Sequence, residues 1–341
     1  MSRRRDPANE PPPDQRQFRR GLDRWFRRRG RNLPWRRTCD PYAILVSEFM
    51  LQQTQVATVI PYYHRWLERF PDFAALARAK ESDVLHAWQG LGYYARARNL
   101  HAAAQFVTQH WGGQLPAVAA KIAQLPGIGR YTAGAIASFA FDLPEPIVDA
   151  NIARVLARLT NCRIPIDASA GRAHLWRTAI ALVPRNGARQ FNSALMELGA
   201  LVCLPREPRC GECPVRRHCR AKQPALLPIK RKRPATIHLT ESYAFSRGCN
   251  GVLLEQSRER WRGMWTLPRL SLAPKQPPLL QFDFPFTHHR VTLAVFAQSG
   301  SALPNEHQHW FRPHALERLP VPSPHRRALT QLLPARKGRR S

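Results

Sequence analysis

Apolar side chains recur at helical spacing through most of the first 220 residues. The first amphipathic helix is expected between Gln15 and Gly30, where the apolar positions i, i+4, i+7 and i+8 are Phe18, Leu22, Trp25 and Phe26. Asp40 and Pro41 supply an N-cap and a first-turn proline for a helix expected to run to about Val59. Further helical patterns cover 73–79, 81–88, 95–110, 117–124, 131–141, 151–160, 170–183 and 188–202. No strand-like alternation interrupts them, so residues 15–220 are predicted to form an all-α domain.

The pattern changes after Cys219. Residues 221–235 combine three prolines with a basic run and have no apolar period, which is typical of a linker. Short β-rich runs follow at 236–246, 251–256 and 290–298, with a hairpin turn expected at 247–251 and a closing helix at 325–333. We therefore predict a small α+β domain over 236–334. Residues 1–14 are expected to form a disordered basic tail, and 335–341 a second basic tail.

The net charge of the chain indicates which class of molecule it binds. The 341 residues include 53 Lys and Arg against 23 Asp and Glu, a formal net charge of +30, which favours binding to a polyanion. A hydrophobic content of 44% excludes a fully disordered chain. The longest nearly uncharged apolar stretch, 131–141, is shorter than the ~20 residues of a membrane helix, and the basic N-terminus lacks the apolar segment of a secretory signal. We expect a cytoplasmic, nucleoid-associated protein that does not enter membranes.

Four of the seven cysteines share one loop with the spacing C-x6-C-x2-C-x5-C: Cys203, Cys210, Cys213 and Cys219. The odd count and the local clustering argue against a secreted disulfide framework. Four thiolates suit either a tetrahedral zinc ion or a 4Fe-4S cluster. Because zinc ribbons usually contain two close pairs and this loop contains one, the spacing favours the 4Fe-4S cluster. The arginines between the cysteines either face phosphates or form a solvated loop face.

A glycine turn, LPGIGRYTAG, spans residues 125–134 between two helical patterns. Gly127 and Gly129 permit left-handed backbone angles, and such a turn directs amide N–H groups outward. At the N-terminus of the following helix, these amides would suit a DNA phosphate. An ordinary turn between two helices is the alternative.

Two carboxylates stand out. Glu48 is the only acid in the helical pattern 41–60, on a face shared with Gln52, Gln55 and Val59, and Asp149 precedes the pattern at 151–160. If Glu48 is buried, desolvation favours its protonated form, as a general acid requires. The alternatives are an exposed acid on a polar stripe for Glu48 and a plain N-cap for Asp149.

Together these segments resemble the helix-hairpin-helix DNA glycosylases that carry an iron-sulfur loop, and among them the MutY-type adenine DNA glycosylases. The resemblance rests on LPW (33–35), SEFMLQQTQVATVIPYY (47–63), GLGYYARARNL (90–100), LPGIGRYTAG, VDAN and the cysteine spacing. A weaker likeness to the family's Nudix-like domain covers RERWRGMWTLP (258–268), FTHHRVTL (286–293) and the C-terminal HRRALTQLL. The resemblance as a whole implies an all-α helix-hairpin-helix glycosylase domain with an iron-sulfur loop, followed by a small α+β Nudix-like domain.

The resemblance also implies roles for individual residues. Glu48 matches the acid that protonates adenine at N7, and Asp149 matches the carboxylate that stabilises or traps the sugar cation, with Asn151 as its polar partner. Cleavage of an N-glycosidic bond leaves a cationic sugar and a poor leaving base, so one acid and one carboxylate address both charges. Residues matching the adenine pocket are Trp35 and Arg36, and those matching groups inserted beside the lesion pair are Gln52, Gln53 and Tyr93.

Tyr131 distinguishes the subfamilies, because endonuclease III-like enzymes carry a lysine there that forms a Schiff base. The alternative for Tyr131 is plain packing in the core. The chain departs from the family at Ala150, where glycine is usual, and at Thr287, where serine precedes the histidine that matches His288 in the lesion-reading segment. Residues 236–341 contain no Nudix glutamate cluster. The second domain is therefore expected to recognise 8-oxoguanine rather than to catalyse.

The resulting expectation is a monomeric, monofunctional enzyme that removes adenine opposite 8-oxoguanine or guanine in double-stranded DNA. A mismatch-specific thymine glycosylase and an endonuclease III-like bifunctional glycosylase are the alternatives within the superfamily. A non-enzymatic DNA-binding module is the alternative from a different class.

Overall fold

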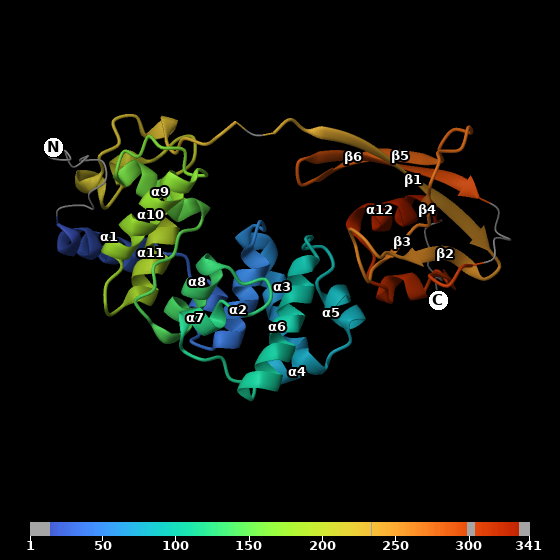
Figure 1. Cartoon of the computed structure of the whole chain (residues 1–341), viewed down its shortest axis with the longest axis horizontal. Coiled ribbons are helices and arrows are strands. Elements are labelled where there is room, and N and C mark those ends of the chain that lie inside the picture. Colours follow the sequence, from blue (N-terminus) through green and yellow to red (C-terminus); the bar gives the residue numbers. More distant parts are fainter. Residues whose placement is uncertain (1–13, 233, 299–303, 334–341) are drawn as a thin grey trace, which may run out of the picture. The chain divides into compact units, whose positions relative to one another are not determined.

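The computed structural model describes residues 14–232, 234–298 and 304–333 (Figure 1). The predicted tail at 335–341 and all of the tail at 1–14 except Asp14 lie outside the described residues. Two compact units divide the chain. The first combines the described residues up to Ala74 with Ala103–Lys232, and the second combines Ala75–Ala102 with the described residues after 233. The segment 75–102 therefore groups with the sheet, although its pattern is helical like that of its neighbours.

The first unit is helical. Its elements are α1 (Gln15–Arg29), α2 (Pro41–Leu51), α3 (Val56–Arg69), α7 (Ala119–Ile122), α8 (Arg130–Phe141), α9 (Ala150–Leu159), α10 (Ser169–Leu182) and α11 (Ala188–Leu201). The helices α4 (Phe73–Arg78) and α6 (Ala95–Trp111) run across the division between the units, and α5 (Glu81–Ala87) belongs to the second. No strand occurs among the described residues before Ile237, which confirms the predicted all-α organisation.

The core of the first unit forms where α1 and α9 to α11 meet. Phe18 and Leu22 of α1 are fully buried beside Leu156 of α9 and Leu198 of α11. The predicted apolar stripe of α1 therefore does face the core, although Trp25 and Phe26 are only partly buried. This packing buries the first turns of α9 in the core and so fixes the position of Asp149, which precedes that helix.

The helix predicted to run from Pro41 to about Val59 is two helices. Gln52 is the C-cap of α2, Gln53 has a left-handed backbone with φ 56°, and α3 begins after Gln55. The expectation that Gln52 and Gln55 share a helical face with Glu48 is wrong, since the chain turns between them. Neither glycine nor proline occurs at this break, so no breaker residue marks it in the sequence.

The glycine turn between α7 and α8 agrees with the prediction at one of its two glycines. Gly127 has φ 75°, in the left-handed region. Gly129 is the N-cap of α8 with φ −94° and ψ 178°, an extended backbone that any residue adopts. A Cβ atom there would meet no atom within 4 Å. The expected left-handed backbone at Gly129 is therefore wrong, and only Gly127 is required by the backbone itself.

The second unit contains a seven-stranded mixed sheet. Its elements are β1 (Ile237–Gly248), β2 (Gly251–Gln256), β3 (Trp265–Thr266), β4 (Arg269–Leu270), β5 (Leu280–Phe286), β6 (His289–Gln298), β7 (Gln308–Phe311) and α12 (Ser323–Leu332). The main strand order is β3-β2-β1-β6-β5, with β1 and β6 parallel; β4 pairs with β1 and β7 with β2. The predicted hairpin turn is confirmed, because Gly248 pairs with Gly251. The strands β3, β4, β5 and β7 were not predicted; β5 contains Pro285, a residue unusual within a strand.

Part of the predicted linker is attached to the first unit. Arg158 donates from Nε to the carbonyl oxygen of Leu227 at 3.0 Å, and the amide of Ile166 donates to the carbonyl of Ile229 at 2.9 Å. The amide of Arg231 donates to the carboxylate of Asp167 at 3.0 Å. The described chain contains no helix that is both long and apolar enough to cross a membrane.

Candidate functional site

The helix α2 carries Glu48 into a small cavity. Asp40 caps this helix by accepting hydrogen bonds from the amides of Tyr42 and Ala43, and every residue from Tyr42 to Met50 is buried. The cavity has a volume of about 150 Å³. Its lining brings together three of the predicted site residues, Trp35, Arg36 and Glu48, with the apolar side chains of Phe26, Ile44, Leu51, Phe139 and Met196.

Glu48 is 5% exposed, which excludes the alternative of a surface acid. Burial, the largest influence, raises the pKa of its carboxyl group to about 7, a hydrogen bond with Tyr131 lowers it, and the charge of Asp149 raises it. Near neutral pH a large share of Glu48 therefore carries a proton. A protonated carboxyl that lines a cavity can transfer its proton to a base bound there.

Tyr131 lies in the first turn of α8 and shares a hydrogen bond with Glu48. Burial and the charges of the two carboxylates hold the pKa of its hydroxyl well above the ordinary value. Tyr131 therefore remains protonated and acts as a donor to Glu48. A lysine at this position would be a nucleophile, which a neutral phenol is not.

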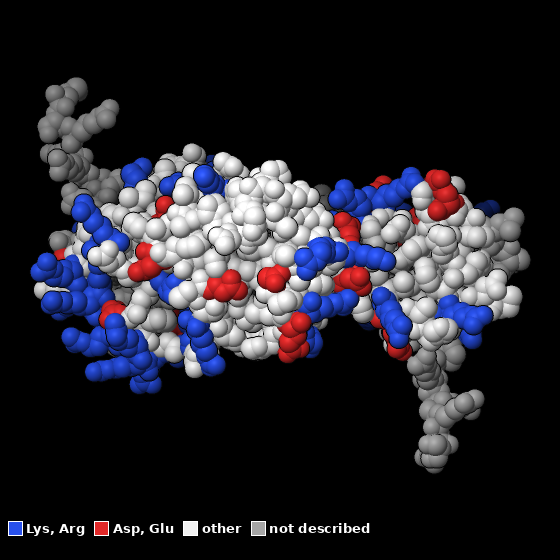
Figure 2. All heavy atoms as spheres, turned by 90° about the horizontal axis from the view of Figure 1, so that it is seen from below, with Lys and Arg blue, Asp and Glu red and all other residues white. Residues whose placement is uncertain are grey.

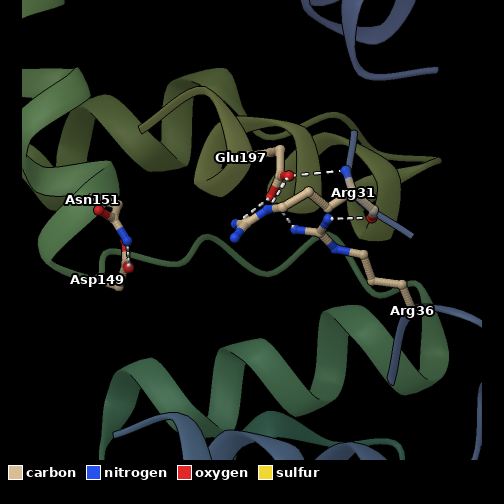
Figure 3. A network of polar contacts seen from close by, with 5 residues as sticks. All are labelled: Arg31, Arg36, Asp149, Asn151 and Glu197. Atoms are coloured by element: carbon tan, nitrogen blue, oxygen red, sulfur yellow. Dashed lines mark hydrogen bonds and ion pairs between the residues drawn. The ribbon is translucent and has the colours of Figure 1, made fainter. Parts of the chain in front are cut away.

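Asp149 is the N-cap of α9, as the plain interpretation of the sequence suggested. Its Oδ1 accepts a hydrogen bond from the amide of Ile152 at 2.6 Å, and its Oδ2 accepts one from Nδ2 of Asn151 at 3.1 Å (Figure 3). Burial, the largest influence, raises the pKa of Asp149 above its ordinary value, and these hydrogen bonds offset only part of that rise. Ala150 begins α9 with an exposed side chain and without a positive φ, so the missing glycine does not strain the backbone.

A network that the sequence analysis missed lies around Glu197. Arg31 donates from Nε to Oε1 of Glu197 at 2.7 Å, and Arg36 donates from Nη2 to Oε2 at 2.8 Å (Figure 3). Burial alone raises the pKa of Glu197, but the hydrogen bonds from both arginines outweigh it and the pKa falls below the ordinary value. The ionised Glu197 therefore orients Arg36 in the cavity wall. A single acid within the apolar pattern 188–202 was the signal that could have identified it.

Arg154 connects Asn151 with the cysteine loop. Its Nη2 donates to Oδ1 of Asn151 at 2.9 Å and to the carbonyl of Gly199 at 2.7 Å, while its Nε donates to the carbonyl of Cys203 at 2.7 Å. The amide of Asn151 is thereby held with its nitrogen toward Asp149. This arginine was not singled out by sequence, because an arginine in a helix is usually exposed.

The four loop cysteines are half-buried free thiols. Burial and then the charges of Cys203, Cys219 and Cys210 raise the pKa of the Cys213 thiol to about 11, so the four groups are near enough to influence one another. The buried Arg158 donates from Nη1 to Sγ of Cys203 at 3.3 Å. Within the described residues no three His, Cys, Asp or Glu side chains converge closely enough to hold one metal ion.

The other predicted residues, Tyr131, Asp149 and Asn151 among them, are not part of the cavity lining. Gln53 and Tyr93 are exposed and have positive φ values of 56° and 48°, which are uncommon for residues other than glycine. Gln52, at the C-cap of α2, is partly buried. Thr287 and His288 are exposed at the turn between β5 and β6, in the second unit.

The N-terminus of α8 is open to solvent. Gly127 and Gly129 are exposed, and no side chain caps the first amides of this helix. Such amides can receive a phosphate. Basic side chains are abundant on the first unit: in Figure 2 they gather at the left, where Figure 1 places α1, whose exposed arginines include Arg16, Arg20, Arg24, Arg27 and Arg28.

Residues 46–178 match the HhH-GPD superfamily of base excision DNA repair proteins. An adenine DNA glycosylase of Mus musculus is 41% identical over 276 residues, 78% of this chain and 53% of the relative. An adenine DNA glycosylase of Buchnera aphidicola subsp. Schizaphis graminum is 33% identical over 257 residues, 74% of each chain. Against three mammalian relatives, the chain spans about half of their length or less, 42%, 53% and 39%.

Solved structures agree on the fold of the helical part. A thermostable thymine-DNA glycosylase matches with a TM-score of 0.55 and 30% identity, over 60% of this chain and 95% of that chain. A non-covalent endonuclease III–DNA complex matches with a TM-score of 0.52 and 24% identity, over 61% and 95% of the two chains. The chain matches the HhH-GPD superfamily and is 33% identical to the Buchnera protein over 74% of each chain. It therefore belongs to the adenine DNA glycosylase family of base excision DNA repair proteins.

Proposed function

We propose that this protein hydrolyses the N-glycosidic bond of adenine paired with 8-oxoguanine or guanine in double-stranded DNA. The observation that carries the proposal is Glu48, a buried carboxyl with a pKa of about 7 in the wall of a cavity. The family's curated members are adenine DNA glycosylases, which supplies the substrate class.

In this mechanism the adenine is flipped out of the helix into the cavity beside Trp35 and Arg36. Glu48 transfers its proton to N7 of the base, which turns a poor leaving group into a neutral one. As the bond breaks, the sugar becomes cationic, and the carboxylate of Asp149 stabilises or traps that cation until water adds to the anomeric carbon and leaves the abasic site. Asn151 keeps one oxygen of Asp149 in a fixed orientation through the hydrogen bond at 3.1 Å.

Other residues would bind the DNA around the flipped base. The amides at Gly127 and Gly129 would receive a phosphate at the N-terminus of α8. Gln52, Gln53 and Tyr93 would fill the gap left in the base stack, and Thr287 with His288 would read the base opposite the adenine. The protein would act on its own as a monomer at the nucleoid in the cytoplasm.

The cysteine loop would hold a 4Fe-4S cluster through Cys203, Cys210, Cys213 and Cys219. A cubane is held by four cysteine thiolates, and these four half-buried free thiols share one loop. The cluster would hold the cysteine loop in place beside α9, where Arg154 and Arg158 donate hydrogen bonds to Cys203. Purified protein should be brown with about four irons per chain. Stoichiometric zinc without visible absorption would exclude the cluster.

Product analysis tests the activity. Duplexes with adenine opposite 8-oxoguanine should yield free adenine and an abasic strand that breaks only after added alkali, because Tyr131 cannot form a Schiff base. Spontaneous nicking with a borohydride-trappable adduct would identify a bifunctional enzyme instead. The 30% identity to a thymine-DNA glycosylase makes a T·G duplex the necessary comparison. Thymine release without adenine release would favour that alternative, and binding without release of any base would favour a DNA-binding module.

A further inference from the structure

One face of β5 carries three phenylalanines, each covered by a neighbouring side chain. Phe282, Phe284 and Phe286 alternate with exposed residues along the strand. The guanidinium of Arg327 lies 4.2 Å from the ring centroid of Phe282, and the ring of Trp261 lies 6.0 Å from that of Phe284. The guanidinium of Arg260 covers Phe286 at 4.3 Å. Phe286 is the residue directly before the turn that carries Thr287 and His288.

Arg260 is held in place by a buried carboxylate. Glu241 of β1 is 8% exposed, and its Oε2 accepts hydrogen bonds from Nη1 of Arg260 at 3.2 Å and from the hydroxyl of Tyr243 at 2.9 Å. The second nitrogen of Arg260 lies 3.1 Å from Oε1 of Glu241, which makes the pair bidentate. The guanidinium plane is therefore fixed before it contacts Phe286, and it also lies 5.3 Å from the ring centroid of Trp261.

The turn itself needs such support. Phe286 pairs with His289, so Thr287 and His288 form a two-residue hairpin turn. Thr287 occupies the first of its central positions with φ 53°, where a β-branched residue is strained and glycine is preferred. A strained backbone persists only when the surrounding structure determines it. Its own side chain contributes one long contact, Oγ1 to Nδ1 of His289 at 3.4 Å.

We propose that Arg260, oriented by Glu241, is a positioning residue that fixes the Thr287–His288 turn through the ring of Phe286 and thereby determines the preference for 8-oxoguanine over guanine opposite adenine. This inference rests on the proposed function, in which that turn reads the opposite base. Arg260 does not contact the base; it acts by holding Phe286 and the strained residue that follows.

The test compares single-turnover adenine excision opposite 8-oxoguanine with excision opposite guanine, using the full-length protein. Arg260→Gln and Phe286→Leu should each lower this ratio by about two- to thirtyfold, the range that one cation–π contact is worth. The double variant should show no further loss, because both changes break the same contact. Arg260→Lys, which keeps the charge, should recover part of the ratio. Arg327→Gln is the matched control, since Arg327 covers Phe282 on the same face away from the turn.

Excision opposite guanine should stay unchanged in all of these variants, which a general loss of folding would not allow. Circular dichroism and tryptophan fluorescence verify that the second unit remains folded, and Phe286→Leu serves if Arg260→Gln does not fold. An unchanged ratio in Arg260→Gln and Phe286→Leu, together with a lowered ratio in His288→Ala, would overturn the positioning role alone. If the ratio of excision opposite 8-oxoguanine to excision opposite guanine is also unchanged in His288→Ala, this turn does not read the base opposite the adenine. That result would overturn the positioning role of Arg260 as well.

Discussion

At the scale of single residues, the environment of Glu48 affects both the protonation state of its carboxyl group and the stability of the folded protein. The folded state raises the pKa of this carboxyl from 4.5 to about 7, so between these values the folded chain binds a proton that the unfolded chain releases. Stability therefore decreases as pH rises through this window, by about 3 kcal/mol in total. The buried acid is therefore a cost to the stability of the fold above pH 4.5.

Glu48→Gln should accordingly stabilise the protein above pH 7 and have little effect at pH 4.5, since glutamine mimics the protonated acid in size and charge. The measurement is the melting temperature of both proteins across this pH range. A melting temperature that is lower in the variant at pH 8 would mean that the ionised carboxylate stabilises the fold, contrary to the raised pKa.

Tyr131→Phe removes the hydrogen bond that lowers the pKa of Glu48. The pKa should then rise above 7, and the pH at which excision declines should move upward by the same amount. Single-turnover rates over pH 5 to 9 measure this shift. A shift toward lower pH would indicate that Tyr131 favours the protonated acid.

At the scale of elements, the two glycines of the turn before α8 are expected to serve different purposes. Gly127 is required by the backbone conformation, whereas Gly129 would leave room for a phosphate. Gly127 has φ 75°, so Gly127→Ala should destabilise the folded protein by about 1–2 kcal/mol and weaken DNA binding. Gly129 has an extended backbone with free space around it, so Gly129→Ala should leave the melting temperature unchanged. It should still weaken duplex binding, because a methyl group there would separate the amides from a phosphate. Wild-type affinity in Gly129→Ala would show that no phosphate approaches this turn.

Much of the element order was predictable, because helical periodicity is a local property of the sequence. Glu48 and Asp149 were identifiable as an isolated acid and as an acid before a helix. The break at Gln53 was not, since neither glycine nor proline occurs there and the left-handed backbone falls on a glutamine. Glu197 and Arg154 were also missed, because their partners Arg31 and Cys203 come from distant segments that only the fold brings together.

At the scale of the whole molecule, the net charge of +30 predicts how the protein meets DNA. Each phosphate contact contributes about −0.9 to the slope of log affinity against log salt, so six contacts would give a slope of about −5. Duplex binding should therefore weaken steeply between low and physiological salt, in fluorescence anisotropy with an undamaged duplex. A flat dependence would contradict an interface built on phosphates.

The measurement that tests the central claim most directly is the pH dependence of single-turnover adenine release by the wild-type protein and by Glu48→Gln. The wild-type rate should decline as pH rises above the pKa of about 7, because only protonated Glu48 transfers a proton to the base. Glu48→Gln should be slower by about 10²–10⁴-fold and should lack this decline, while still binding duplex DNA. A variant that retains most of the wild-type rate, or that keeps the same decline with pH, would contradict the assignment of Glu48 as the general acid.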